Sequence, residues 1–188
     1  MPPKTKFTKD GIINAAFELV RSRGVDSLSA RSLAKELGSS TAPIFSAFAG
    51  IDEVRAAVID KAKSLYAEYL REGMTQATPF KGAGLSYIRF SKDEPQLFKL
   101  LFMPDNPDGE PTHFLPSSDE NFPAVLEALH SKTNISEENA KKLYNHLSVY
   151  VYGLAVLNAQ GCFVFTDDDI DGMLTEVFTA LKKEMQDE

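Results

Sequence analysis

Apolar residues recur every three or four positions along most of this chain, which is the spacing of one face of an α-helix. The first stripe covers residues 9–23 and follows Thr8, a good N-cap residue. A second, shorter stripe covers residues 30–37 and is capped by Ser29. Gly38 comes next and ends it, because glycine adopts the left-handed conformation at little cost.

A third short helix is predicted over residues 40–47. Either Ser39 or Ser40 would cap it, and Pro43 falls in its first turn, where a missing backbone N–H costs little. Two short helices joined by three or four residues form a helix-turn-helix, whose second helix can enter the major groove of DNA. The spacing therefore predicts a recognition helix over residues 40–47.

The rest of the chain also shows helical spacing, so the fold class we predict is all-α. The expected helices cover 51–72, 80–92, 94–103, 119–131, 137–161 and 166–185. We expect Gly73 to end the first of these, Ser136 to cap the fifth, and Thr166 with Asp169 to form a capping box at the start of the last. Residues 104–117 hold four prolines and are predicted to form a loop.

The N-terminal pattern resembles the DNA-binding domain of the TetR family of transcriptional regulators. The resemblance spans roughly residues 8–55 and is carried by Ser29, Arg31, Leu33, Ala34, Gly38, Ser39, Ser40, Phe45 and Phe48. Further along, the pattern of one branch of TetR ligand-binding domains is matched by Tyr87, Phe90, Pro95, Leu97, Phe98, Leu101 and Phe102. The resemblance implies a helix-turn-helix DNA-binding domain over 1–50 and a helical effector-binding and dimerisation domain over 51–188.

Charge is distributed unevenly between these two parts. Residues 1–50 carry seven Lys or Arg and four Asp or Glu, a net charge of +3. The whole chain has 20 Lys or Arg and 27 Asp or Glu. Residues 51–188 therefore carry 13 basic and 23 acidic residues, a net charge of −10. A basic head on an acidic body is expected when one end binds phosphate, although an excess of three charges can also arise by chance.

We expect the DNA contacts to come from the helix-turn-helix and the segment before it. The candidate residues are Lys6, Ser29, Arg31, Ser40, Thr41, Ala42, Pro43, Phe45 and Ser46. Residues 40–47 include no Arg, Lys, Asn or Gln for bidentate base contacts, so recognition would depend on fit, on Arg31 and on DNA shape. A solvated helix face or an ion pair is the other interpretation of Arg31.

The resemblance also implies a small-molecule effector and a homodimer. Candidate ligand-binding residues are Tyr87, Phe90, Phe98, Phe102, Phe114, Phe122 and Tyr150, each of which could instead be an ordinary core residue. Candidate dimer-interface residues are Leu147, Val151, Leu154, Leu174, Val177, Phe178 and Leu181, from the last two predicted helices. The implied function is a repressor that a small apolar or aromatic ligand releases from its double-stranded DNA operator.

The sequence can also be compared with two other functions, a ligand-binding protein and an enzyme. The tyrosine, histidine and lysine usual in the family are replaced by Phe45, Ala47 and Ile51, which leaves open a ligand-binding protein with a weakened or vestigial DNA-binding head. An enzyme finds no support, because no Ser-His-Asp order, HExxH or CxxC is present. We therefore predict no catalytic residues and no cofactor.

The remaining motifs favour structural interpretations. The sequence Glu127-x-x-His130 is a single motif where a di-iron site needs two, so we predict no metal and read His130 as a surface residue. The single Cys162 allows no internal disulfide, and its apolar neighbours predict burial. No run of about 18 apolar residues predicts a membrane span, and the expected location is the cytoplasm.

Overall fold

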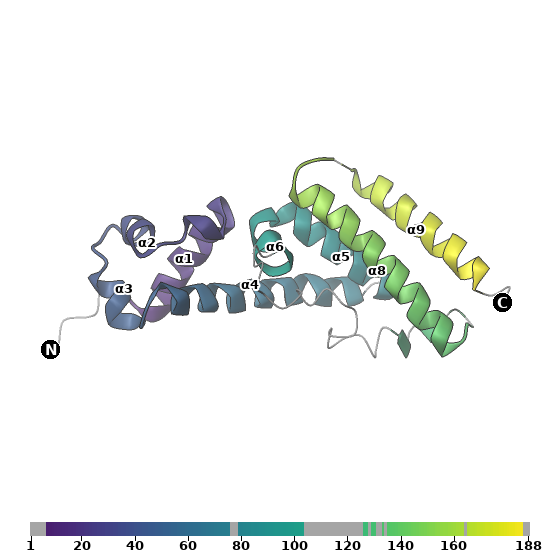
Figure 1. The fold of residues 1–188 in the computed structure, drawn as a ribbon, viewed down its shortest axis with the longest axis horizontal. Helices are drawn as coiled ribbons and strands as arrows, with labels where there is room; N and C mark the ends of the chain where they lie inside the picture. Colours follow the sequence, from purple (N-terminus) through teal and green to yellow (C-terminus); the bar gives the residue numbers. More distant parts are fainter. Residues whose placement is uncertain are drawn as a thin grey trace. The chain divides into compact units, whose positions relative to one another are not determined.

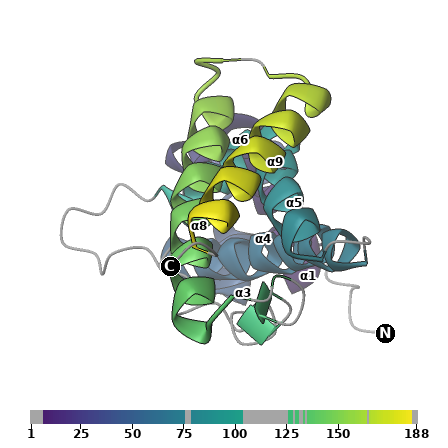
Figure 2. The same ribbon diagram turned by 90° about the vertical axis from the view of Figure 1, so that its right-hand side faces the viewer.

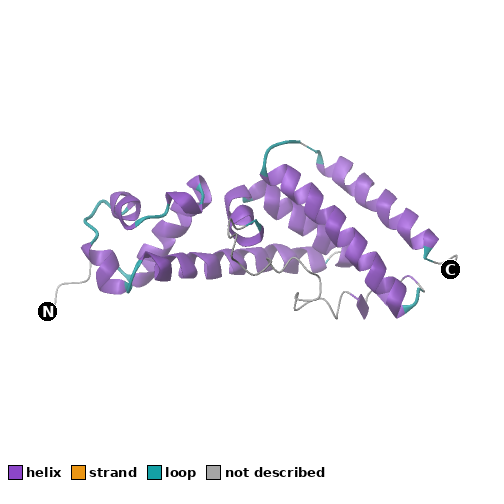
Figure 3. Ribbon diagram, in the orientation of Figure 1, coloured by secondary structure: helices purple, strands orange, loops and turns teal. Residues whose placement is uncertain are grey.

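The computed structural model describes residues 7–75, 79–103, 126–127, 129–130, 133, 135–163 and 165–185. All regular elements in these ranges are helical (Figures 1 and 3), so the all-α prediction is confirmed. They are α1 Lys9–Arg23, the 3-10 helix η1 Val25–Ser27, α2 Ala30–Glu36, α3 Ala42–Ala47, α4 Ile51–Met74, α5 Pro79–Asp93, α6 Pro95–Phe102, α8 Glu137–Ala159 and α9 Asp167–Glu184. The predicted loop over 104–117, and most of the helix predicted over 119–131, lie outside the described residues.

The chain divides into two compact units. The first comprises Met1–Leu65 and Gln96–Met103, and so contains α1, α2, α3, the first part of α4 and most of α6. The second comprises Tyr66–Pro95 and Pro104–Glu188, and contains the end of α4 with α5, α8 and α9. The functional boundary at residue 50 concerns which segment binds DNA, and it stays a prediction.

Local capping signals set the helix ends of the first unit as predicted. The Thr8 hydroxyl accepts the N–H of Gly11 at 3.0 Å at the start of α1. Ser29 and Ser32 form a reciprocal capping box at the start of α2, in which each hydroxyl accepts the other residue's N–H, at 3.1 and 2.9 Å. Gly38 follows α2 with a φ of 60°, the left-handed conformation that its lack of a side chain allows.

The start of α3 differs from the prediction, because Ser39 belongs to the end of α2 instead. The N–H of Ser39 donates to the carbonyl of Ala34 at 2.9 Å, and the N–H of Gly38 donates to that of Lys35 at 3.1 Å. This pair of bonds is a Schellman motif, which closes the C-terminus of a helix. The next helix therefore begins later, at Ala42. The side chain of its N-cap residue Thr41 accepts no capping hydrogen bond, but the hydroxyl of Ser40, the other predicted cap, accepts the N–H of Ala42 at 3.4 Å.

Gly73 was predicted to end the long helix, and this is wrong, since α4 continues to Met74. A Cβ atom at Gly73 would overlap with the backbone carbonyl of Gly82 and the hydroxyl of Ser86, both on α5. Glycine is thus needed here because the backbones of α4 and α5 approach closely, although glycine is less favourable than alanine in a helix.

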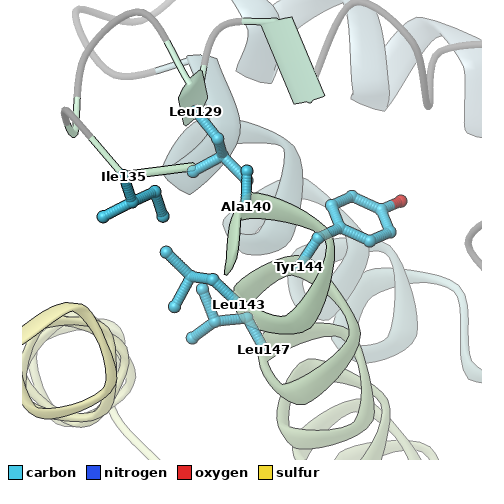
Figure 4. Packing of buried hydrophobic residues seen from close by; sticks show 6 residues of the cluster. All are labelled: Leu129, Ile135, Ala140, Leu143, Tyr144 and Leu147. Atoms are coloured by element: carbon cyan, nitrogen blue, oxygen red, sulfur yellow. The ribbon is translucent and has the colours of Figure 1, made fainter. Parts of the chain in front are cut away.

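The core of the second unit lies between α8 and its neighbours. The helices α8 and α9 run antiparallel and side by side, and α5 packs along α8 (Figures 1 and 2). Figure 4 shows the buried cluster Leu129, Ile135, Ala140, Leu143, Tyr144 and Leu147. Partly buried side chains that pack against it are Leu126, Val177, Phe178, Leu181 and Met185. The cluster therefore joins α9 to α8 within one subunit.

The predicted caps of α8 and α9 are confirmed. The Ser136 hydroxyl accepts the N–H of Asn139 at 3.1 Å, and Thr166 and Asp169 form the expected capping box. Ion pairs also connect α9 to α5: Lys92 lies 2.8 Å from Asp167, and Lys81 lies 2.5 Å from Asp171. Two separate elements thus hold α9 in place.

Cys162 was predicted to be buried, and it is exposed. The apolar helix ends at Ala159, and Gly161 turns the chain with a φ of 68°, so Cys162 lies in the connection to α9. Phe163 beside it is 56% exposed, and its ring stacks on Phe165 with centroids 5.8 Å apart. Apolar neighbours in sequence do not bury a residue when the helix ends before them.

Among the described helices, none has the length and apolar character required to cross a bilayer.

Candidate functional site

The short helix α3 has one buried and one exposed face. Ile44 is fully buried, and Phe48, which ends the helix, is 3% exposed. Ala42, Phe45 and Ser46 are all exposed, and since they are spaced by three and four residues they share one face. The buried face fixes α3 in the first unit, and the exposed face offers an uncharged surface for a partner.

The helix that precedes α3 in the chain, α2, carries exposed positive charge. Arg31 and Lys35 are exposed and four residues apart, so they lie on one face of that helix. Neither forms an ion pair with another described residue. Lys35 was not among the predicted contacts, although its spacing from Arg31 is a signal in the sequence that indicates it.

The other predicted DNA-contacting residues lie on α2, on α3 or in the turn that joins them. Ser29 and Ser40 are exposed, whereas Thr41 and Pro43 are half-buried. The Ser29 hydroxyl is already hydrogen-bonded in the capping box of α2. Lys6 lies outside the described residues.

Polar contacts hold the start of α4 against α1 and thereby fix the chain on either side of α3. Glu53 accepts from the Lys9 ammonium at 2.9 Å and from the N–H of Ala49 at 2.7 Å. The Lys9 ammonium also lies 4.7 Å from the centroid of the Phe48 ring, within cation–π range. Because Ala49 directly follows this ring, the Glu53 carboxylate anchors the turn that leaves α3.

Acidification should weaken this anchor. The Lys9 hydrogen bond, and then the Ala49 N–H, hold the pKa of Glu53 below its ordinary value of 4.5. A depressed folded-state pKa stabilises the fold above the unfolded-state pKa, and this contribution is lost as the pH falls through the folded-state pKa. Acidification from neutral pH to below 4.5, the ordinary pKa of Glu53, should lower the thermal midpoint of the wild type by more than that of Glu53→Gln. Circular dichroism melts at a series of pH values measure both midpoints. Equal falls in both proteins would contradict the anchor.

An aromatic cluster forms in the second unit around two of the predicted ligand-binding residues. Tyr87 and Phe90 of α5 are buried, and the rings of Tyr66 and Tyr69 from α4 lie against them, with centroids 5.3–5.9 Å apart. Burial is the main cause that raises the pKa of Tyr87, so its phenol is neutral. Tyr66 was not predicted, although it lies three residues before Tyr69, which belongs to the apolar stripe of that helix.

A network of ion pairs and hydrogen bonds around Arg89 lies next to this aromatic cluster. The Arg89 guanidinium lies 2.9 Å from Glu72 and 3.5 Å from Asp93, and 4.7 Å from the centroid of the Tyr69 ring. The Tyr69 hydroxyl donates to Asp93 at 3.2 Å. Burial, followed by the charge of Asp93, raises the pKa of Tyr69. These contacts tie the end of α4 to α5 next to the aromatic rings.

The other predicted ligand-binding residues are distributed differently. Phe98 and Phe102 belong to α6 in the first unit, where their ring centroids are 5.2 Å apart. Tyr150 is half-buried on α8. Phe114 and Phe122 lie outside the described residues. The structure thus brings Tyr87 and Phe90 together, and a pocket shared by all seven residues stays a prediction.

The predicted dimer-interface residues contribute to packing within the subunit. Those that are buried by their own chain are Leu147, Leu154 and Leu174. Those of α9 that pack on the core cluster are Val177, Phe178 and Leu181. Val151 is half-buried, and a Cβ at Gly84 of α5 would lie 3.3 Å from it. Whether any of them also contacts a second subunit stays a prediction.

The outward face of α8 carries an apolar residue that the sequence analysis did not single out. Val149 is 69% exposed, and Gly153, one turn later, is exposed as well. A Cβ at Gly153 would meet no atom of the described residues within 4 Å. Because the second half of α8 is apolar on nearly all sides, periodicity alone did not show which face the subunit buries.

One known family matches the chain. The family model described as Tetracyclin repressor-like, C-terminal domain matches residues 80–181. The match begins in α5 and ends in α9, and therefore includes the core cluster and part of the aromatic cluster. No curated protein matches the chain at a significant level.

Proposed function

Since the chain belongs to the tetracycline repressor-like family of transcriptional regulators, we propose that it binds double-stranded operator DNA through α2 and α3. The observation that carries this proposal is the division of α3, which buries Ile44 completely and exposes Ala42, Phe45 and Ser46. In a helix-turn-helix the second helix contacts base edges in the major groove. The exposed face of α3 is the surface available for that role.

The positive charges of α2 suit the sugar-phosphate backbone. Arg31 and Lys35 are exposed and carry no ion pair with another described residue, so they are available to phosphates. Phosphate contacts supply affinity and position the protein, whereas base contacts supply specificity. The acidic remainder of the chain would repel DNA, which favours binding through this end.

Alanine substitution of Arg31 together with Thr41 should weaken operator binding at least about thirtyfold, because two base or phosphate contacts worth about 1–3 kcal/mol each are lost. We would measure binding by fluorescence anisotropy against DNA from upstream of the protein's own gene, as a function of salt. The double variant should also show a shallower salt dependence, since a phosphate contact is lost. Lys141→Ala on α8 is the matched control, a lysine removed from outside the proposed surface.

Failure of the wild type to bind any duplex at low salt would overturn the proposal. Binding of aromatic ligands by such a protein would favour the alternative, a ligand-binding protein with a vestigial DNA-binding head. The uncharged exposed face of α3 is the observation that keeps this alternative in view.

We propose further that the protein represses transcription and that a small apolar or aromatic ligand releases it. The cluster of Tyr66, Tyr69, Tyr87 and Phe90 supports a ligand of this class, since such sites are lined mainly by aromatic and apolar side chains. Two of these residues belong to α4, whose earlier residues lie in the first unit. A ligand that displaces α4 would oppose DNA binding with a reciprocal coupling of about 1–3 kcal/mol. An unchanged operator affinity in the presence of a bound ligand would contradict this coupling.

The protein is also proposed to act as a homodimer, with the outward face of α8 in the interface. Glycine inside a helix costs about 1 kcal/mol relative to alanine. No described residue of the same chain requires it at Gly153, because none lies within 4 Å of the position that a Cβ would take. Close approach of a second chain's backbone would require it, and the exposed Val149 one turn away would then be buried. A dimer would place two recognition helices about 34 Å apart, one turn of duplex DNA.

Val149→Arg should convert the dimer into monomers, because an unpaired charge would be buried in the interface. Light scattering coupled to size-exclusion chromatography measures the change in mass directly. Asp26→Arg, at an exposed position of the first unit, is the matched control and should leave the mass unchanged. A wild-type protein that is monomeric at all accessible concentrations, or a Val149→Arg variant that stays dimeric, would contradict the proposed interface.

A further inference from the structure

Phe45 is exposed in a position where its ring has no apparent structural use. Its side chain lies on the outward face of α3 and is 54% exposed. The residues that share this face, Ala42 and Ser46, are small and cannot cover an aromatic ring. Burying apolar area of this size against a partner is favourable, since each square ångström removed from water contributes about 25 cal/mol. The exposed ring therefore offers apolar area to a partner at the centre of the outward face of α3.

The chemistry of the ring restricts what it can contact on DNA. A phenyl group carries no hydrogen-bond donor, so it cannot hold a phosphate or bond to a base edge. In the major groove the apolar group that a natural base pair displays is the 5-methyl group of thymine. Phenylalanine and alanine side chains both contact this methyl in known complexes. The exposed face of α3 offers one of each, at Phe45 and Ala42.

The rest of α3 adds no competing mode of recognition. The helix contains no arginine or lysine to bind guanine and no asparagine or glutamine to bind adenine. Ser46 and Thr41 offer hydroxyl groups, which accept from or donate to several different bases. Apolar contact is thus the most selective interaction that this helix can make.

We infer that Phe45 reads thymine 5-methyl groups and that the operator carries a T·A pair opposite this ring in each half-site. This inference rests on the proposed DNA-binding function, and it names the base feature that the recognition helix selects. The fully buried Ile44 next in sequence fixes the helix, so the ring direction is set by the fold. Arg31 and Lys35 supply affinity for phosphate, and Phe45 supplies the choice of base.

The test removes single methyl groups from the DNA. A duplex is first selected from a randomised pool by the full-length protein, and thymine is then replaced by deoxyuridine at one position at a time. We expect one replacement in each half-site to weaken binding about fourfold, the size expected for one buried methyl group. Replacing that thymine with 5-methylcytosine, paired with guanine, should weaken binding less than replacing it with cytosine, because the methyl group is retained.

The protein variants connect this effect to Phe45. In Phe45→Ala the side chain ends at Cβ and no longer reaches the base contacted by the ring, so the deoxyuridine and thymine duplexes should bind equally. Phe45→Leu should keep part of the difference because it keeps a longer apolar side chain. Circular dichroism shows that each variant is folded. The control for the DNA is a deoxyuridine placed outside the sequence that the selection enriches.

The outcomes separate this inference from the function on which it rests. A selected duplex without thymine opposite α3, or a methyl effect of equal size in the wild type and Phe45→Ala, overturns the role of Phe45 and leaves DNA binding intact. Recovery of no duplex at all overturns both. A methyl effect that disappears in Phe45→Ala supports both.

Discussion

Replacing Gly73 with alanine should reduce the free energy of unfolding by about 2 kcal/mol, although alanine is the better helix former. The added Cβ would overlap with the carbonyl of Gly82 and the hydroxyl of Ser86. Overpacking of this kind costs up to about 3 kcal/mol, which exceeds the roughly 1 kcal/mol that alanine contributes through helix propensity. Urea unfolding followed by circular dichroism gives the difference directly.

Gly172→Ala provides the control for this experiment, because Gly172 also lies inside a helix but faces open space. Within the chain, no described atom opposes a side chain at Gly172, so helix propensity should decide and this variant should gain up to about 1 kcal/mol. The two glycine substitutions should therefore change stability in opposite directions. Equal effects would mean that α4 and α5 do not approach as closely as the structure shows.

Ile44→Ala should have the second large effect, a loss of about 2–4 kcal/mol in the free energy of unfolding. Ile44 is fully buried, and α3 is only six residues long. A helix of that length does not form alone in water, so packing of its buried face must hold it in place. Operator binding should weaken as well, because a loosened α3 no longer presents its exposed face in one orientation.

Phe45→Ala is the matched control, one residue along the same helix. Phe45 is more than half exposed, so the variant should change the free energy of unfolding by no more than about 0.5 kcal/mol. Chemical denaturation of both variants, with anisotropy measurements on DNA, separates stability from recognition. If Phe45→Ala destabilised the protein as much as Ile44→Ala, the division of α3 into a structural and a recognition face would be wrong.

The helix boundaries could largely be predicted from sequence, because the signals that set them are local. Thr8, Ser29, Ser136 and Thr166 each cap the helix that was expected to follow them. A capping hydroxyl bonds within three residues along the chain, so its effect does not depend on the rest of the fold. The same is true of Gly38, whose backbone conformation is required by the turn itself.

The errors arise where residue type and helical spacing do not decide the role of a residue. Gly73 resembles a helix terminator, but its role depends on Gly82 and Ser86 in another helix. Ser39 resembles an N-cap, but its N–H completes the preceding helix. Cys162 has apolar neighbours, but the chain turns at Gly161 before it can be covered. Gly73 thus depends on a partner in another helix, whereas Ser39 and Cys162 depend on where the preceding helix ends.

The exposure of the candidate DNA-contacting residues was easier to predict from sequence than the membership of the aromatic cluster. The exposed residues lie on one short helix and the adjoining helix, so spacing along the sequence was enough to group Arg31 with the outward face of α3. The aromatic cluster combines two helices, and Tyr66 was missed because no local pattern connects it to Tyr87 and Phe90. The identity of the bound molecule depends on cavity shape, which sequence periodicity does not encode.

The exposed thiol of Cys162 bears on how the quaternary structure is measured. An accessible cysteine on each of two chains can be oxidised by air to an intermolecular disulfide, and the product has the mass of a dimer. The stacked rings of Phe163 and Phe165 beside it form an apolar surface that favours association of two such chains. Mass measurements that test the proposed dimer therefore need a reductant, or a serine in place of the cysteine, so that a covalent linkage is not mistaken for a non-covalent dimer.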